Sequence, residues 1–298
     1  MAGAAPGRRR VRIATRGSAL ARWQSVAVAG RLGSLDAALD CELLVVETTG
    51  DRRTDLPITE IGGQGVFVKE VQAAVLDGRA ELAVHSAKDL PSLPTPGLVV
   101  AAYPERADPR DALVGTDLRG LGTGATVATG SVRRRAQLAA ARPDLRLVEL
   151  RGNIATRLQR VPPGGAIVVA VAGVARLGLA DRVSEVLDPG VMLPQVGQGA
   201  LAVECRSDDR GTAELLAAID DQVVRAEVDA ERAFLACLGG GCDLPAGALA
   251  RATAADLEIE ALVAFPGAAP RRAKRRGPVA DGEALGRALA AELLGGQR

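Results

Sequence analysis

Aromatic side chains and histidine are scarce in this sequence. Aromatic residues make up 2% of the 298 positions, Trp23 and Tyr103 are the only members of their types, and His85 is the only histidine. Proteins that hold single-stranded nucleic acid usually stack its bases on aromatic rings, and few are present here. The 37 Lys and Arg residues against 36 Asp and Glu leave a net charge of +1, which gives no overall attraction to nucleic acid or to an anionic membrane. We therefore expect neither as a partner.

Cysteine pairs and long apolar runs are also missing. The four cysteines form no Cys-x-x-Cys pair and stand beside a single histidine, so we expect no metal site. The longest apolar run, 166–175, is shorter than the about 20 residues that a membrane helix needs. Residues 1–10 hold three arginines but no apolar segment of signal-peptide length. We interpret them as a disordered lead-in to a cytoplasmic protein.

A short apolar strand that ends in a polar cluster is the first candidate site. Leu82 and Val84 have the spacing of a strand. Ligands of α/β proteins usually bind beyond the carboxyl ends of strands, which makes this strand end a candidate active-site edge. The alternative is a solvated turn in which a carboxylate caps a helix. The polar residues concerned are His85, Ser86, Lys88 and Asp89, which Pro91 follows.

Arginines follow one predicted strand after another. The strand 11–16 ends at Arg16, and Ser18 is placed to cap the next helix. Because arginine binds carboxylates through two parallel hydrogen bonds, the recurrence predicts a cleft for a ligand with several carboxylates or phosphates. Capped helices with solvated arginines remain the alternative. The later arginines are Arg133 with Arg134, next to the predicted cap Ser131, then Arg151 with Arg157, and finally Arg176 alone.

Alternating strand and helix patterns indicate an α/β fold of more than one domain. A segment rich in proline and charge, 103–111, has the composition of a connection between domains. After a long predicted helix, 223–238, we expect a third domain with a strand at 257–265, a basic turn at 271–276 and a helix at 282–294. Gln198 lies between glycines that permit either a close backbone approach or a tight turn. Cys242 lies in a glycine-rich loop, where reactivity and chance are both open.

Seven short motifs, taken together and in order, resemble the porphobilinogen deaminase family from about residue 11 to the C-terminus. The resemblance implies three domains of α/β class. The first two, 11–103 and 104–199, would be similar to periplasmic binding proteins with a hinge between them, and the third, 222–298, would be a small α+β domain. It further implies that residues from about 200 to 221 complete the first domain. The motifs are 13–18, 65–70, 83–91, 151–158, 194–200, 204–206 and 240–245.

The same resemblance implies a reaction and a cofactor. Members condense four porphobilinogen molecules head to tail, release ammonia and give hydroxymethylbilane for tetrapyrrole synthesis. A dipyrromethane, one per chain, would be held through a thioether to Cys242, and the protein would be a monomer. Asp89 matches the catalytic carboxylate. The implied cofactor contacts are Ser86, Lys88, Thr129, Ser131, Arg133, Arg134, Arg151 and Gly173, and the implied substrate contacts are Arg16, Ser18, Arg157, Arg176 and Gln198.

Three departures from the family pattern concern the details of binding. Gln64 stands where many members have lysine, Gly130 replaces a serine, and Gly164 with Gly165 replaces an acidic residue. A competing hypothesis is a hinged receptor for a small polycarboxylate that performs no chemistry. A weaker one is nucleic-acid binding through residues 133–135 and 271–276, which would show steep salt dependence.

Overall fold

The computed structural model describes residues 9–48, 65, 68–239 and 245–295. Gln64 and Cys242 lie outside these residues. The chain divides into two compact units, one formed by Met1–Glu105 with Leu201–Arg225 and the other by Arg106–Ala200 with Ala226–Arg298. No helix among the described residues is long and apolar enough to cross a membrane.

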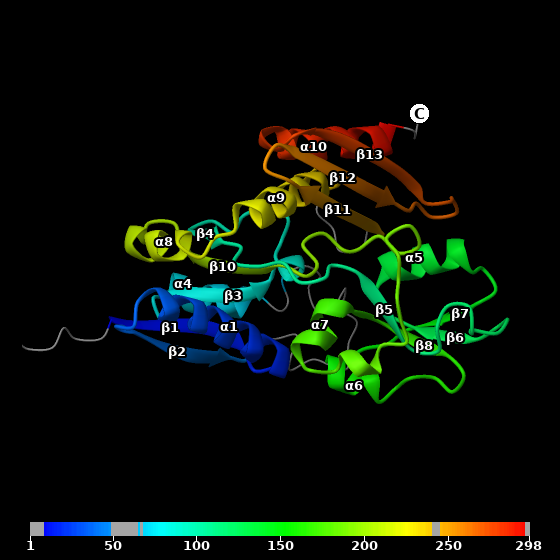
Figure 1. Ribbon diagram of the computed structural model, residues 1–298, viewed down its shortest axis with the longest axis horizontal. Coiled ribbons are helices and arrows are strands. Elements are labelled where there is room, and N and C mark those ends of the chain that lie inside the picture. Colours follow the sequence, from blue (N-terminus) through cyan, green and yellow to red (C-terminus); the bar gives the residue numbers. More distant parts are fainter. Residues whose placement is uncertain (1–8, 49–64, 66–67, 240–244, 296–298) are drawn as a thin grey trace, which may run out of the picture. The chain divides into compact units, whose positions relative to one another are not determined.

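The first unit contains a five-stranded sheet of order β2-β1-β3-β10-β4 (Figure 1). β1 is parallel to β2 and β3, whereas β10 is antiparallel to β3 and β4. Helices cover both faces: Ile13 packs with Leu32 on one side, and Ala83 packs with Val75 on the other. Its elements are β1 (Arg9–Arg16), α1 (Ala19–Leu35), β2 (Leu39–Val46), α4 (Lys69–Leu76), β3 (Leu82–Ser86), the 3-10 turn η1 (Ala87–Asp89), β4 (Leu98–Ala102), β10 (Leu201–Arg206) and α8 (Arg210–Ala217).

The second unit repeats this sheet in the order β7-β6-β8-β5-β9. β6 is parallel to β7 and β8, and β5 is antiparallel to β8 and β9. Leu138 packs on one face and Val174 on the other. Its elements are β5 (Asp111–Gly115), β6 (Thr126–Ala128), α5 (Val132–Ala141), β7 (Arg146–Val148), α6 (Ile154–Leu158), β8 (Ala166–Ala170), α7 (Val171–Arg176), η2 (Ala180–Arg182) and β9 (Glu185–Val186).

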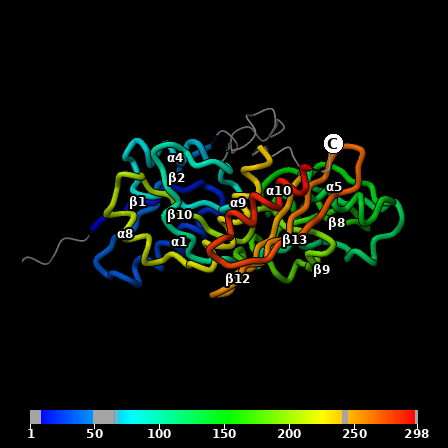
Figure 2. Tube along the Cα trace, turned by 90° about the horizontal axis from the view of Figure 1, so that it is seen from above, coloured from blue at the N-terminus to red at the C-terminus, as the bar shows by residue number. Residues whose placement is uncertain are grey.

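A third, antiparallel sheet of order β11-β12-β13 belongs to the second unit. Phe234 from α9 and Leu289 from α10 pack on one of its faces with alternate residues of β12 such as Ile259. In Figure 2 α10 runs beside β13. The elements are α9 (Gln222–Cys237), β11 (Ala246–Ala252), β12 (Asp256–Val263), β13 (Arg271–Pro278), η3 (Val279–Asp281) and α10 (Gly282–Gly295). The predicted α/β class, with three sheets, is confirmed.

Two connections link the first two sheets, 103–110 after β4 and 187–200 before β10, and they run antiparallel to each other. Arg106 and Ala200 form a bridge, and Ala107 N–H donates to Gly199 O at 3.1 Å. Gly199 has φ +89°, and a Cβ there would lie 2.2 Å from the Ala107 oxygen. Glycine is required at this position because any side chain would force the two connections apart.

Two sequence predictions were wrong at the chain's ends. The lead-in was expected to reach residue 10, but β1 begins at Arg9, because Arg9 and Arg10 pair with β2 and Arg10 binds Glu42 at 2.7 Å. The predicted basic turn 271–276 is the strand β13. Four of its five basic residues have acidic cross-strand or helical partners, which allows so many of them on one strand. The ion pairs join Arg272 and Lys274 to Glu260, Arg275 to Glu292, and Arg276 to Asp256.

An isosteric substitution at Glu81 tests the ion pair between Arg12 and Glu81 in the first unit. Glu81 accepts from Arg12 N–H at 2.6 Å and from Arg12 Nη2 at 2.6 Å. Burial opposes ionisation of Glu81, but the Arg12 hydrogen bonds dominate and lower its pKa. Its stabilising effect is therefore full above the unfolded pKa, about 4.3, and is lost as the pH falls through the lower folded pKa. We expect Glu81→Gln to lower the melting temperature by about 1–2 °C at pH 7. That difference should vanish in acid in a pH series of thermal melts, and a difference that grew in acid would contradict the assignment.

Candidate active site

The first unit holds a cavity at the carboxyl ends of β1 and β3. Ser18 caps α1 by accepting from Ala21 N–H at 3.3 Å, so the free N–H groups of the helix start lie beside Arg16. Asp89 ends the 3-10 turn that follows β3. The polar residues that line this cavity are Arg16, Ser18, Gln24, His85, Ser86 and Asp89. Five of the six were singled out in the sequence, and the structure brings them together.

Gln24 is the polar cavity residue that the sequence did not reveal. It lies within α1, is 3% exposed, and its Nε2 donates to Ser86 Oγ at 2.7 Å. A glutamine in the middle of an apparently ordinary helix belongs to no motif, and the only signal was its place in the first two turns after the cap at Ser18. Lys88, the other predicted residue here, is half-buried on the same 3-10 turn.

A buried polar chain lies behind His85. Glu204 on β10 is 4% exposed and lies 3.1 Å from His85 Nε2, joining the two side chains across adjacent strands. Gln72 Nε2 donates to both Glu204 oxygens at 2.9 and 3.1 Å, and Thr95 Oγ1 donates to Gln72 Oε1 at 3.2 Å. A buried carboxylate is stable only with such partners. This network of polar side chains holds the end of β3 in place, and Asp89 lies three residues after that end.

The second unit gathers its predicted residues at one sheet edge. β7, β6 and β8 are adjacent and parallel, so their carboxyl ends share an edge. Thr129 follows β6 and accepts from Ser131 N–H at 3.2 Å, and Ser131 Oγ in turn caps α5 by accepting from Arg134 N–H. The arginines expected here follow β6, β7 and β8 along the chain, either directly or on the next helix. The residues at these three strand ends are Thr129, Ser131, Arg133, Arg134, Arg151, Arg157, Gly173 and Arg176.

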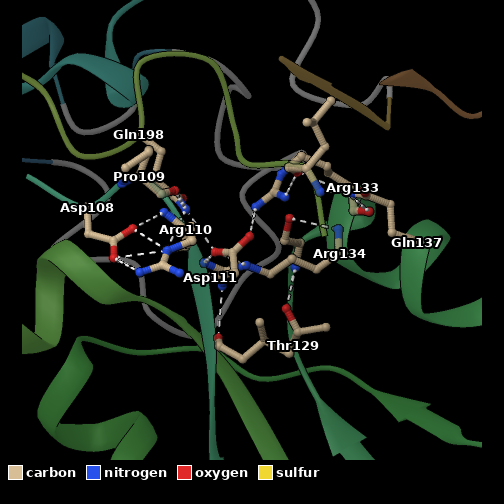
Figure 3. A network of polar contacts seen from close by, with 12 residues as sticks. Asp108, Pro109, Arg110, Asp111, Thr129, Arg133, Arg134, Gln137 and Gln198 are labelled. Atoms are coloured by element: carbon tan, nitrogen blue, oxygen red, sulfur yellow. Dashed lines mark hydrogen bonds and ion pairs between the residues drawn. The ribbon is translucent and has the colours of Figure 1, made fainter. Parts of the chain in front are cut away.

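Arg133 and Arg134 share one carboxylate, that of Asp111 (Figure 3). Their side chains are 4% and 6% exposed, and Asp111 is fully buried between contacts of 2.7 Å to each. Burial would raise the pKa of Asp111, but the two guanidinium groups and the Gln198 amide hold it well below its usual range. Burial also lowers the pKa of Arg133, against the attraction of Asp111. Asp111 was missed because it sits in a segment rich in charge and proline, which usually indicates surface.

Of the remaining predicted residues of this unit, Arg151 and Arg157 contact nearby residues, and Arg176 reaches the connection before β10. Arg151 Nε binds Glu149 at 3.0 Å and Arg157 Nε donates to Gly152 O at 2.7 Å. Arg176 Nη2 donates to Gly199 O at 2.8 Å. Two further residues are buried away from the surface. Gly173 lies inside α7, which begins where the sequence predicted the end of a longer strand, and Gln198 is fully buried and donates to Pro109 O at 2.7 Å and Asp111 Oδ1 at 2.9 Å.

Two of the unusual glycines have a steric explanation. A Cβ on Gly130 would lie 2.9 Å from Leu150 O, and one on Gly165 would lie 2.1 Å from Thr126 O. Real Cβ atoms are not found at these distances, so a larger residue at either position would displace backbone. The serine and the acidic residue of the family pattern therefore do not fit this backbone without a shift.

The donors found in each unit suit the same chemistry. Guanidinium groups, hydroxyls and helix N-termini all favour carboxylates, and Asp89 adds a carboxylate that can face a cation. No group of three or more His, Cys, Asp and Glu side chains with metal-binding geometry occurs in the described part of the chain. Each set, taken by itself, therefore has donors that suit a ligand with carboxylates.

Comparison with known proteins agrees with this chemistry. Residues 11–214 match the family model described as porphobilinogen deaminase, dipyromethane cofactor binding domain, and residues 225–295 match that of the porphobilinogen deaminase C-terminal domain. Among solved structures the chain resembles the BenM effector binding domain with benzoate, at 15% identity over 72% of this chain and 90% of that one, with a TM-score of 0.42.

Curated relatives cover nearly the whole chain. The porphobilinogen deaminase of Acidothermus cellulolyticus is 48% identical over 95% of this chain and 88% of its own. That of a Roseiflexus species is 47% identical over 95% of both chains. Two family models that together span most of the sequence, and relatives of this identity, leave one assignment: the chain belongs to the porphobilinogen deaminase family.

Proposed function

We propose that this protein is a transferase that joins four porphobilinogen molecules head to tail, releasing ammonia, and then releases hydroxymethylbilane for tetrapyrrole synthesis. The observation that carries the proposal is the cavity in which Asp89 faces the same space as Arg16 and Ser18. Each porphobilinogen carries an acetate and a propionate, so a growing chain is a string of carboxylates. Cationic and hydrogen-bonding groups hold such a chain, while one carboxylate acts on the pyrrole.

Asp89 has the electrostatic role in the proposed reaction. Loss of ammonia leaves positive charge on the pyrrole, and a fixed carboxylate close to the pyrrole nitrogen stabilises that charge as it develops. The same carboxylate can accept or return a proton. Arg16, together with the start of α1 beyond Ser18, would hold a carboxylate of the incoming pyrrole. His85 and Gln24 line the same cavity.

The residues of the second unit fit a dipyrromethane, whose carboxylates need buried cations. Within the described residues, Arg133 Nε is a buried donor without a hydrogen-bond partner, and Arg133, Arg134 and Asp111 together carry a net charge of +1. When bound, the dipyrromethane supplies a nucleophilic pyrrole carbon to which porphobilinogen is joined. We propose that Cys242 holds it, with further contacts from Lys88, Ser86, Thr129, Ser131 and Arg151. Arg157 and Arg176 would contact the growing chain, which would be bound by a cytoplasmic monomer. Gly173 and Gln198, also expected as contacts, are buried within the fold, so we assign them a structural role.

Intact mass spectrometry tests the proposal most directly. We expect the purified protein to exceed its polypeptide mass by two porphobilinogens less two ammonias, and Cys242→Ser to show the bare mass. Because the thioether is the only covalent link proposed, no other cysteine should matter, and Cys237→Ser, an exposed thiol five residues earlier, serves as the matched control. An apoprotein that gains no adduct after porphobilinogen is supplied would favour the receptor without chemistry instead.

A further inference from the structure

Asp111, the first residue of β5, lies outside the seven motifs that identified the family. It is fully buried, and its Oδ2 accepts from Arg133 Nη2 at 2.7 Å while its Oδ1 accepts from Arg134 Nη2 at 2.7 Å and Arg134 Nε at 3.2 Å. We propose that Asp111 is a positioning residue that sets the two guanidinium groups in place for a carboxylate of the dipyrromethane. The inference rests on the function proposed above.

Each guanidinium is held from two directions before any ligand arrives. Arg134 Nη1 donates to Val168 O at 2.9 Å, in addition to the contacts that Arg134 makes with Asp111. Arg133 Nη1 donates to Leu193 O, and its Nη2 to Asp111. Arginine has a long flexible side chain, so ordering it at the moment of binding would reduce affinity. Asp111 removes that cost because both side chains are already fixed.

The charges explain why one carboxylate serves two arginines. Two guanidinium groups next to each other in a buried site repel, and burial already lowers the pKa of Arg133. Asp111 offsets the repulsion but balances only one of the two positive charges. The cluster therefore keeps a net charge of +1, and Arg133 Nε remains a buried donor without a partner among the described residues. One further carboxylate, supplied by the ligand, completes both the charge and the hydrogen bonding.

Asp111 also has a structural contact from which its proposed role must be separated. Gln198 Nε2 donates to Asp111 Oδ1 at 2.9 Å and to Pro109 O at 2.7 Å, which joins the two connections between the sheets. If this contact were the whole role of Asp111, replacing Asp111 would lower the stability of the protein. Ligand binding would then fall only as far as the folded fraction falls. A positioning role predicts instead a loss of cofactor loading at temperatures where the variant is folded.

Two variants of different severity make the test. Asp111→Asn keeps the size but places an amide N–H₂ against a guanidinium, whereas Asp111→Glu keeps the charge and moves it by one methylene. The control is Glu231→Gln, which removes a different fully buried carboxylate of the same unit, one that binds Arg106. Each is prepared as full-length apoprotein, checked by circular dichroism and thermal melting, then mixed with porphobilinogen while intact mass follows the adduct.

We expect loading of Asp111→Asn to be at least about tenfold slower than that of the unchanged protein. Asp111→Glu should load at an intermediate rate and, once loaded, keep its kcat within about twofold. Glu231→Gln should melt lower and load at the unchanged rate. Wild-type loading rates in both Asp111 variants, or slowing that simply follows the melting temperature across all three variants, would overturn the inference. If Asp111→Asn does not fold, the comparison of loading rates between Asp111→Glu and Glu231→Gln decides whether the inference holds. Failure of the unchanged protein to load would instead remove the proposed function.

Discussion

Arg106→Met is expected to destabilise the second unit by about 3–5 kcal/mol. Arg106, on the first connection between the sheets, places Nη1 2.8 Å from Glu231 and 3.2 Å from Glu227, both on α9. Its Nε donates to Gln198 O at 3.2 Å on the second connection. Burial lowers the pKa of Arg106, but the attraction of Glu231 and Glu227 outweighs burial and raises that pKa. Arg106 is therefore charged in the native state. Methionine fills the volume but leaves two carboxylates without their cation.

Glu231 explains why the loss should be so large. It is fully buried, and burial raises its pKa despite Arg106 and two backbone donors, the N–H groups of Gly197 at 2.7 Å and Ala250 at 2.8 Å. Without Arg106 the group must take up a proton or draw in water. Denaturant unfolding should show the loss, and the double variant Arg106→Met/Glu231→Gln should recover part of it, since the uncompensated charge is then gone. Additive effects in that cycle would contradict the pairing.

Strand-end chemistry is the part of the site that sequence predicts well. Ser18 and Ser131 were expected to cap helices because their residue type suits that position, and both do. The arginines after β6, β7 and β8 were expected at one edge because apolar strands alternating with helices form parallel sheets. The caps depend on interactions within a few residues of the chain, and the shared edge follows from the alternation of strand and helix patterns, which the sequence shows directly.

Long-range pairing is what the sequence conceals. Asp111 and Glu231 stand in stretches of charged residues that look solvated, yet both are fully buried. The partner of Asp111, Arg133, is 22 residues away along the chain, and the partner of Glu231, Arg106, is 125 residues away. Their burial depends on where β5 and α9 pack, which no local pattern encodes. Residues 271–276 were misread for the same reason, since a run of basic residues is typical of a turn until the acidic neighbours on β12 are known.

The largest effect on chemistry is expected at Asp89. Asp89→Asn keeps the size of the side chain, removes its charge and replaces one acceptor oxygen by an amide donor. A carboxylate that stabilises a developing cation and moves a proton contributes about 10²–10⁴ in rate, so kcat should fall by at least about 100-fold. Because Asp89 is half-buried at the end of a short 3-10 turn, whose core contact comes from Ala87, the melting temperature should hardly change.

Turnover must be counted per loaded molecule, because assembly of the cofactor from porphobilinogen would use the same carboxylate. Intact mass gives the loaded fraction, and single-turnover release of ammonia gives the rate. Asp77→Asn, an exposed carboxylate at the end of α4 that pairs only loosely with Arg79 at 3.7 Å, is the matched control in the same unit. Asp89→Glu should retain part of the rate, since the charge remains and only its distance from the pyrrole changes. Normal turnover by loaded Asp89→Asn would show that the cation is stabilised by another group, and His85, in the same cavity, would be the next residue to replace.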